Sequence, residues 1–150
     1  MPQGFTGAIE PLKELYGTDG KPDAAKAKKV LEDAGVDIPV SLPLQYNPDH
    51  YGPSSGDEYA LVKKQLEADG LFKVDLKSTE WVTYQKQRVT DYPAYQLGWF
   101  PDYSDADNYL SPFFAKDNFL SNNYDNPAVD KLISEQRGMA DAAERTKAIE

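Results

Sequence analysis

The chain has 150 residues, of which 40% are hydrophobic and 12% aromatic, enough to form one folded domain with a core of its own. Its 16 basic and 25 acidic residues give a formal net charge of -9, which would repel a phosphate backbone, so we expect no nucleic-acid partner. Because the chain has no cysteine, a disulfide framework, a thiol nucleophile and a cysteine-ligated zinc site are all excluded.

The first 22 residues are rich in glycine and proline and predict a connecting segment that lies on the domain. We expect the domain itself to occupy residues 23–150. No apolar run approaches the roughly 18 residues that a membrane span needs. The first residues also lack the basic stretch and apolar core of an export signal.

Three helices are predicted in the first two thirds of the chain from apolar residues that recur at spacings of three and four. They cover residues 23–34, 57–68 and 80 to about 90. Ser78 or Thr79 is the expected cap of the third helix, whose aromatic stripe is typical of a core-facing surface.

Three strands alternate with these helices. Residues 40–46 and 71–78 alternate apolar and polar side chains, and residues 92–99 carry so few charges that we expect a central strand. Pro43 indicates that the first strand is interrupted or lies at an edge. This order predicts an α/β fold, a right-handed βαβαβ unit whose mainly parallel sheet is flanked by helices.

The remainder of the chain is predicted to be helical. Asp107 can cap a short helix that Pro112 disturbs, and Asn126 with Pro127 begins a second one. Residues 140–150 predict the start of a further helix without an ending signal, so we expect the domain to be truncated there.

The stretch from Gln96 to Tyr109 carries the main candidate site. It leaves the third predicted strand through a glycine and a tryptophan and enters an acidic, tyrosine-rich loop. Because the carboxyl ends of parallel strands share one edge of a sheet, Asn47 is expected on the same edge as Trp99 and Asp102. Open α/β sheets bind ligands at that edge.

Three motifs, in order, resemble one known family. They are the helix Asp23–Gly35, similar to Ala-Lys-x-Leu-Leu-x-x-Ala-Gly; the sequence Gly-Trp-x-x-Asp ending at Asp102 and followed by Asp-x-Asp-Asn-Tyr-Leu; and Asn-Asn-Tyr-x-Asn-Pro-x-Val-Asp-Lys-Leu-Ile from residue 122. The chain resembles the family 5 extracellular solute-binding proteins, the oligopeptide and dipeptide receptors of ABC importers.

The resemblance implies one lobe of a periplasmic-binding-protein type II fold and a non-catalytic function without a cofactor. An ABC permease and a missing N-terminal lobe of the same protein would be its partners. It also implies an extracytoplasmic location, with membrane attachment only through a lipid anchor outside this sequence.

The same resemblance implies a set of ligand contacts. Asp102 would bind the amino terminus of a peptide, and the backbone around Trp99 would pair with the extended ligand. Some tripeptide-binding relatives carry a basic residue near Gln96, so the neutral side chain here leaves the ligand length open. The predicted ligand-binding residues are Asp102, Trp99, Gly98, Phe100, Gln96 and Asn47.

Several alternatives remain open at this point. Asp102 could be satisfied by local amides, and Trp99 could pack in the core. The ligand could be a metal chelate, a sugar or an opine, and the chain could instead be a free-standing flavodoxin-like enzyme or interaction domain.

Metal and enzyme motifs are not found. A calcium loop that begins at Asp105 would need glycine at its sixth position and glutamate at its twelfth, where the chain has Leu110 and Lys116. His50 is expected to be solvated, and the chain lacks the common nucleophile, phosphate-binding and dinucleotide motifs.

Overall fold

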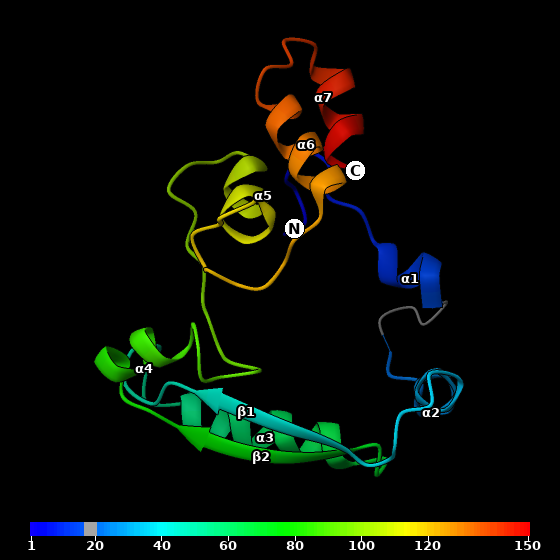
Figure 1. The fold of residues 1–150 in the computed structure, drawn as a ribbon, viewed down its shortest axis with the longest axis vertical. Coiled ribbons are helices and arrows are strands. Elements are labelled where there is room, and N and C mark those ends of the chain that lie inside the picture. Colours follow the sequence, from blue (N-terminus) through cyan, green and yellow to red (C-terminus); the bar gives the residue numbers. More distant parts are fainter. Residues whose placement is uncertain (17–20) are drawn as a thin grey trace. The chain divides into compact units, whose positions relative to one another are not determined.

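The computed structural model describes residues 1–16 and 21–150, with the side chains of residues 12 and 14 left out. Two compact units make up the chain (Figure 1). The sheet unit is Thr18–Gly98, and the helical unit combines Met1–Gly17 with Trp99–Glu150. This division differs from the predicted boundary at residue 22.

The sheet unit follows the predicted α/β order. Its elements are α2 (Ala24–Asp33), β1 (Val40–Tyr46), α3 (Ser55–Glu67), β2 (Phe72–Ser78) and α4 (Trp81–Gln87). The two strands pair in parallel, from Val40 opposite Phe72 to Tyr46 opposite Ser78, and α3 packs against them. The predicted α/β class, the first two strands and the three helices are therefore confirmed.

The helix caps follow local chemistry, with one correction. The Asp23 carboxylate accepts a hydrogen bond from the backbone N–H of Lys26 at 3.0 Å and so begins α2. At α4 the cap is Glu80, which accepts from the N–H groups of Val82 and Thr83. The prediction that Ser78 or Thr79 caps this helix is wrong, because the longer Glu80 side chain reaches both donors.

The predicted third strand, residues 92–99, is also wrong in extent. Only an isolated parallel bridge joins Tyr95 to Gln45 within the described residues. Gln45 donates its N–H to the Ala94 oxygen at 3.0 Å, and its own oxygen accepts from the Gln96 N–H at 2.9 Å. One rung of the ladder has formed, and the described sheet has two strands.

Side chains and a proline explain why the ladder stops. The residue that would begin the preceding rung is Pro43, which has no N–H to donate. On the other side, the Asn47 N–H bonds the Gln96 side-chain oxygen at 2.9 Å. The Gln96 backbone oxygen instead accepts the Tyr84 hydroxyl at 2.8 Å, so a regular rung cannot form there.

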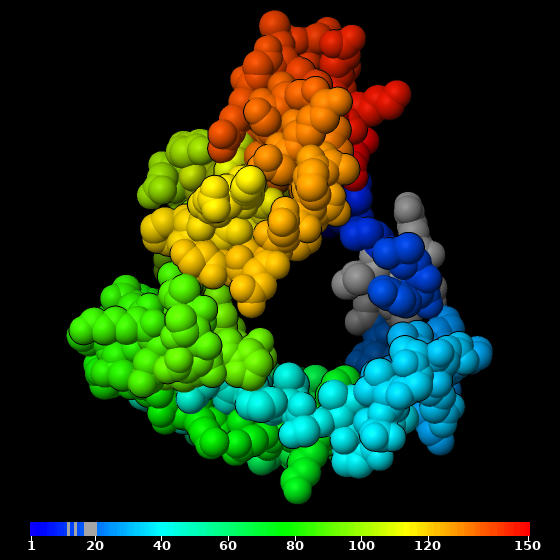
Figure 2. All heavy atoms as spheres, in the orientation of Figure 1, coloured from blue at the N-terminus to red at the C-terminus, as the bar shows by residue number. Residues whose placement is uncertain are grey.

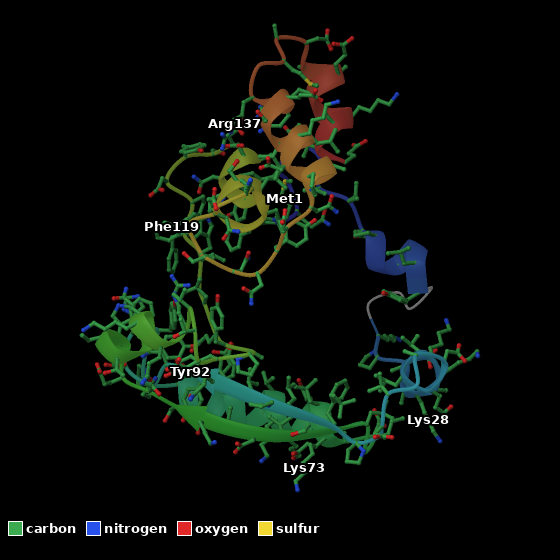
Figure 3. The ribbon with its side chains drawn as sticks, viewed as in Figure 1. Met1, Lys28, Lys73, Tyr92, Phe119 and Arg137 are labelled. Carbon is green, nitrogen blue, oxygen red and sulfur yellow. The ribbon has the colours of Figure 1, made fainter. Side chains whose placement is uncertain are left out.

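The core of the sheet unit contains Leu71, Val74 and Tyr84, which are all buried. In β2 the neighbouring Lys73 is exposed and points away from the ribbon, as a strand with one covered face requires (Figure 3). The prediction that the aromatic stripe of α4 faces the core is confirmed for Tyr84, while Trp81 is half-buried.

The helical unit contains α1 (Pro11–Tyr16), α5 (Asp107–Phe114), α6 (Pro127–Gln136) and α7 (Ala142–Ile149). Helices α6 and α7 pack against each other, and α5 packs on α6 (Figure 2). The Asn126 side chain caps α6 as predicted, at 3.1 and 3.3 Å from two backbone N–H groups. Asp107 lies in the first turn of α5 and is not its cap, and α1 was not predicted.

The N-terminal segment packs on the helical unit. The Phe5 ring meets Tyr109 edge-on with centroids 4.9 Å apart. A Cβ atom at Gly7 would lie 2.3 Å from Ile149 Cγ2, and the φ of Gly7 is +77°. Glycine is therefore required where this segment passes α7.

Candidate ligand-binding site

The predicted site residues divide between the two units. Asn47, Gln96 and Gly98 belong to the sheet unit, whereas Trp99, Phe100 and Asp102 belong to the helical unit.

Asn47 is fully buried, and its side chain is engaged by the protein. Its Nδ2 donates to Asp49 Oδ1 at 2.7 Å and to the Thr79 backbone oxygen at 3.0 Å. Its Oδ1 accepts from the N–H groups of Asp49 at 3.3 Å and His50 at 2.6 Å. These bonds fold the loop after β1 back onto the end of β2.

Gln96 lies beside Asn47 and bonds it. Its side-chain oxygen accepts the Asn47 N–H, and its backbone oxygen accepts the Tyr84 hydroxyl. Burial raises the pKa of Tyr84 far above its usual value, so this hydroxyl remains a donor at physiological pH. Both site residues thus help to fix the edge of the sheet.

Gly98 is in close contact with Tyr51. Its N–H donates to the Tyr51 hydroxyl at 2.9 Å, and a Cβ at this position would lie 2.7 Å from Tyr51 Cε1. The Tyr51 ring also meets His50 and Trp81 edge-on, at 4.8 and 5.7 Å. The exposed His50 ring stacks on Trp81 at 3.7 Å, a contact that the sequence did not predict.

In the helical unit, one side chain connects Trp99 with Asp102. Asn108 is only 4% exposed, and its Oδ1 accepts both the Trp99 Nε1–H at 3.1 Å and the Asp102 backbone N–H at 3.2 Å. The Asp102 side chain is exposed, and no described residue forms a hydrogen bond or ion pair with its carboxylate. The loop thus presents a carboxylate to solvent from a fixed backbone.

Aromatic rings surround the other face of this loop. The Trp99 ring meets Phe113 at 5.1 Å and Phe119 at 5.9 Å, both edge-on. Phe119 is labelled in Figure 3 and is 70% exposed, and Phe100 is 83% exposed. Trp99 is half-buried, so part of its surface packs on these rings and part stays accessible.

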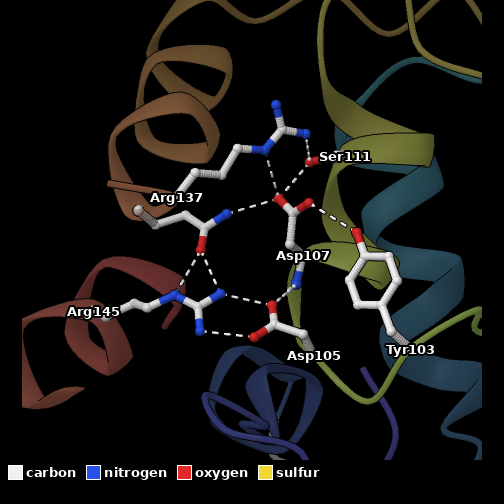
Figure 4. A network of polar contacts seen from close by, with 7 residues as sticks. Tyr103, Asp105, Asp107, Ser111, Arg137 and Arg145 are labelled. Atoms are coloured by element: carbon white, nitrogen blue, oxygen red, sulfur yellow. Dashed lines mark hydrogen bonds and ion pairs between the residues drawn. The ribbon is translucent and has the colours of Figure 1, made fainter. Parts of the chain in front are cut away.

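A polar network fixes the end of the loop to α6 and α7 (Figure 4). Arg145 binds Asp105 through Nη1 at 2.8 Å and Nη2 at 2.6 Å. Its Nε and Nη2 also donate to Gln136 Oε1, and Gln136 Nε2 donates to Asp107 Oδ1 at 2.7 Å. The Asp105 side chain in turn accepts the Asp107 N–H at 2.8 Å.

The second half of the network surrounds Asp107. Its carboxylate accepts hydrogen bonds from Ser111, Arg137 and Tyr103, at 2.5, 3.0 and 3.3 Å. Burial raises the pKa of Asp107, but the bonds from Ser111 and Arg137 outweigh burial and leave it lowered. The bonds from Arg145 lower the pKa of Asp105.

Three of these residues carry no clear signal in the sequence. Asn108 lies within the family-like motif, but nothing in its spacing marks it as a shared acceptor. Tyr51 lies in a stretch of polar and turn-forming residues after β1, and Arg145 is 40 residues from its partner Asp105. Only the folded chain brings these side chains to the loop.

Within residues 1–16 and 21–150, no group of three or more histidine, cysteine, aspartate or glutamate side chains is arranged to hold a metal ion. None of the described helices is both long and apolar enough to cross a membrane.

Comparison with known families identifies the chain. Residues 1–121 match the model of the bacterial extracellular solute-binding proteins, family 5 middle region. The chain belongs to this family. This membership favours a solute-binding protein over the alternative of a free-standing flavodoxin-like enzyme or interaction domain.

Individual members of family 5 show how much of a receptor is present. The periplasmic oligopeptide-binding protein OppA of Haemophilus influenzae is 30% identical over 126 residues, which are 82% of this chain and 23% of that protein. The chain thus spans about a quarter of the length of the curated relatives it matches.

Solved structures of family 5 proteins confirm the fold. The crystal structure of Haemophilus influenzae OppA in complex with the peptide RPPGFSPFR matches 99% of this chain and 30% of that one, with a TM-score of 0.77 and 26% identity. A dipeptide-binding protein from Pseudoalteromonas sp. SM9913 in complex with Met-Leu matches 98% and 29%, with a TM-score of 0.76 and 25% identity. The chain has the fold of part of a periplasmic-binding-protein type II receptor.

Proposed function

We propose that this chain is part of the substrate-binding component of an ABC importer and helps to capture oligopeptides or dipeptides. The observation that carries the proposal is the exposed Asp102 carboxylate, which lacks a bonding partner among the described residues and stands on a loop fixed by Asn108. A carboxylate so placed can form a charge-assisted hydrogen bond with a peptide ammonium group. Peptide binding by the relatives named above supports the same ligand class.

The main chain beside Asp102 would bind the ligand backbone. Extended peptides pair with exposed backbone groups irrespective of their side chains, which gives broad specificity. At Gly98 the N–H is already bonded to the Tyr51 hydroxyl at 2.9 Å. A ligand carbonyl would therefore replace this hydroxyl, or the ligand would pair with the backbone of Trp99 and Phe100.

The other predicted contacts have a supporting role in this proposal. Asn47 and Gln96 bond each other and fix the sheet edge from which the loop leaves. Neither supplies a cation for a ligand carboxylate, so ligands of several lengths would be accepted. The Trp99 edge would contact the first residue of the peptide.

The remaining parts of the system follow from the family. A second, N-terminal lobe would close over the ligand by a hinge motion and exclude water, and the closed receptor would deliver it to an ABC permease. The relatives' names place them in the periplasm, and we propose an extracytoplasmic location here too.

Calorimetric titration tests the proposal in a full-length receptor, meaning a protein of the relatives' length that contains this chain. The two ligands are trialanine and N-acetyl-trialanine. We expect the parent to prefer the free amine, and Asp102→Asn to weaken trialanine binding by about 10- to 100-fold. Asp125→Asn, which also removes one exposed carboxylate of the helical unit, is the control.

Two results would contradict different parts of the proposal. Unchanged trialanine affinity in Asp102→Asn would remove the ammonium contact. A parent receptor that binds neither peptide would favour the alternative class of ligand, a metal chelate, a sugar or an opine.

A further inference from the structure

Asn108 is buried next to the proposed ligand contacts, and no contact of its own with a ligand has been proposed. It is the second residue of α5, and its side chain is 4% exposed. Buried amide side chains require hydrogen-bond partners. Here the acceptor oxygen serves two donors, the Trp99 indole at 3.1 Å and the Asp102 backbone at 3.2 Å.

The chemistry of these two bonds fixes the orientation of the amide. Both partners of Asn108 are N–H donors, so only its oxygen can face them, and a flipped amide would oppose donor to donor. One oxygen atom therefore sets the distance between the Trp99 ring and the Asp102 backbone. Loss of this acceptor would leave two partly buried donors without this partner.

The polar network in turn holds Asn108 in place. The preceding residue, Asp107, is bonded through its N–H to Asp105 and through its carboxylate to Gln136. Arg145 binds both Asp105 and Gln136. The start of α5, and Asn108 with it, is thereby fixed by side chains from α6 and α7 (Figure 4).

We propose that Asn108 is a positioning residue for ligand binding. It holds the Trp99 indole and the Asp102 backbone in the arrangement that presents the carboxylate to a peptide ammonium group. This inference rests on the proposed function for its role in binding, but the arrangement itself can be tested without any ligand.

Two variants and two readouts test the proposal in the full-length receptor. Asn108→Leu has a similar volume but no acceptor, whereas Asn108→Asp keeps an oxygen that can accept from both donors. The first readout is the ratio of affinities for trialanine and N-acetyl-trialanine. The second is the indole N–H resonance of Trp99 in protein labelled with 15N-tryptophan, assigned through Trp99→Phe.

We expect Asn108→Leu to lower the affinity ratio by about tenfold and to move the indole resonance to the position of a weaker hydrogen bond. Asn108→Asp should keep most of the ratio of the two peptide affinities and the indole resonance of the hydrogen-bonded state. A general loss of stability would not separate the two variants in this way. Unchanged ratio and resonance in Asn108→Leu would overturn the proposal, as would equal loss in both variants.

Failure of the proposed function would be recognised separately. If the parent receptor does not distinguish the two peptides, the Asp102 contact is wrong. The indole resonance of Trp99 still tests the positioning role of Asn108 without a ligand. A shift in Asn108→Leu that is absent in Asn108→Asp supports this role, and no shift in Asn108→Leu contradicts it.

Discussion

Arg145 holds Asp105 through two parallel hydrogen bonds, from Nη1 to Oδ2 at 2.8 Å and from Nη2 to Oδ1 at 2.6 Å. Such a bidentate pair fixes orientation as well as distance. It joins α7 to the loop that precedes α5, across 40 residues of sequence. The C-terminal helix therefore contributes to the shape of the candidate site although it is far from it in the chain.

The ion pair between Asp105 and Arg145 predicts that the protein loses stability in acid. Hydrogen bonds from Arg145 lower the folded-state pKa of Asp105 below the unfolded value of about 3.9. A group with a lowered folded-state pKa stabilises the protein above its unfolded pKa, and this contribution is lost as the pH falls through the folded pKa. We expect the free energy of unfolding contributed by this pair to be constant from pH 8 to about 5 and to fall below about pH 4.

Urea unfolding at several pH values measures this contribution. Asp105→Asn should be less stable than the parent at pH 7, by about 1–2 kcal/mol for a partly exposed ion pair. The difference in free energy of unfolding between Asp105→Asn and the parent should become smaller towards pH 3. Asp125→Asn is the matched control, and its free energy of unfolding should stay close to that of the parent at pH 7. A stability difference between Asp105→Asn and the parent that does not change with pH would contradict the prediction.

Tyr84→Phe should destabilise the sheet unit. The Tyr84 hydroxyl is the donor to the Gln45 and Gln96 backbone oxygens, at 3.1 and 2.8 Å, and the residue is fully buried. Removing it takes this donor from two partly buried oxygens, although the Gln45 oxygen keeps its bond from the Gln96 N–H. We expect a cost of about 1–3 kcal/mol in the free energy of unfolding. Thermal and urea unfolding would measure the change.

Tyr103→Phe is the control for this prediction. Its hydroxyl makes a single bond of 3.3 Å to Asp107, and the residue is 52% exposed, so we expect a change within about 0.5 kcal/mol. Equal losses in the two variants would contradict the prediction. They would show that the bonds from the Tyr84 hydroxyl to the Gln45 and Gln96 oxygens contribute little to stability.

Gly98→Ala should disturb the contact with Tyr51. The new Cβ would lie 2.7 Å from Tyr51 Cε1, closer than packed carbon atoms approach. We expect a loss of about 1–3 kcal/mol in the free energy of unfolding, because the ring must move away from its hydrogen bond with the Gly98 N–H. Tyr51→Ala in the same chain should remove most of this cost by eliminating the clash.

A double-mutant cycle of these two substitutions measures the coupling by urea unfolding. Gly138→Ala is the control, because its nearest neighbour, the Glu135 oxygen, would lie at an ordinary 3.7 Å from the added Cβ. Strictly additive effects of Gly98→Ala and Tyr51→Ala would contradict the close approach.

The sequence by itself determined the local elements and the family. Helix α6 begins where Asn126 and Pro127 predict it, because capping and the first-turn proline act within a few residues. Strands β1 and β2 were readable because their alternation follows from a side-chain period of two. The Gly-Trp-x-x-Asp motif ending at Asp102 placed the loop in a known family.

Only the tertiary structure decided what these elements do together. The third strand failed as a prediction because its pairing depends on Pro43 and Tyr84, which lie 52 residues before Tyr95 and 12 residues before Gln96. Alternation along residues 92–99 does not reveal either of them. Asn108 and Arg145 became visible only as partners of Trp99 and Asp105. Periodicity and capping are local properties of a chain, whereas hydrogen bonds and ring contacts join residues that only folding brings together, and the candidate site is made from such contacts.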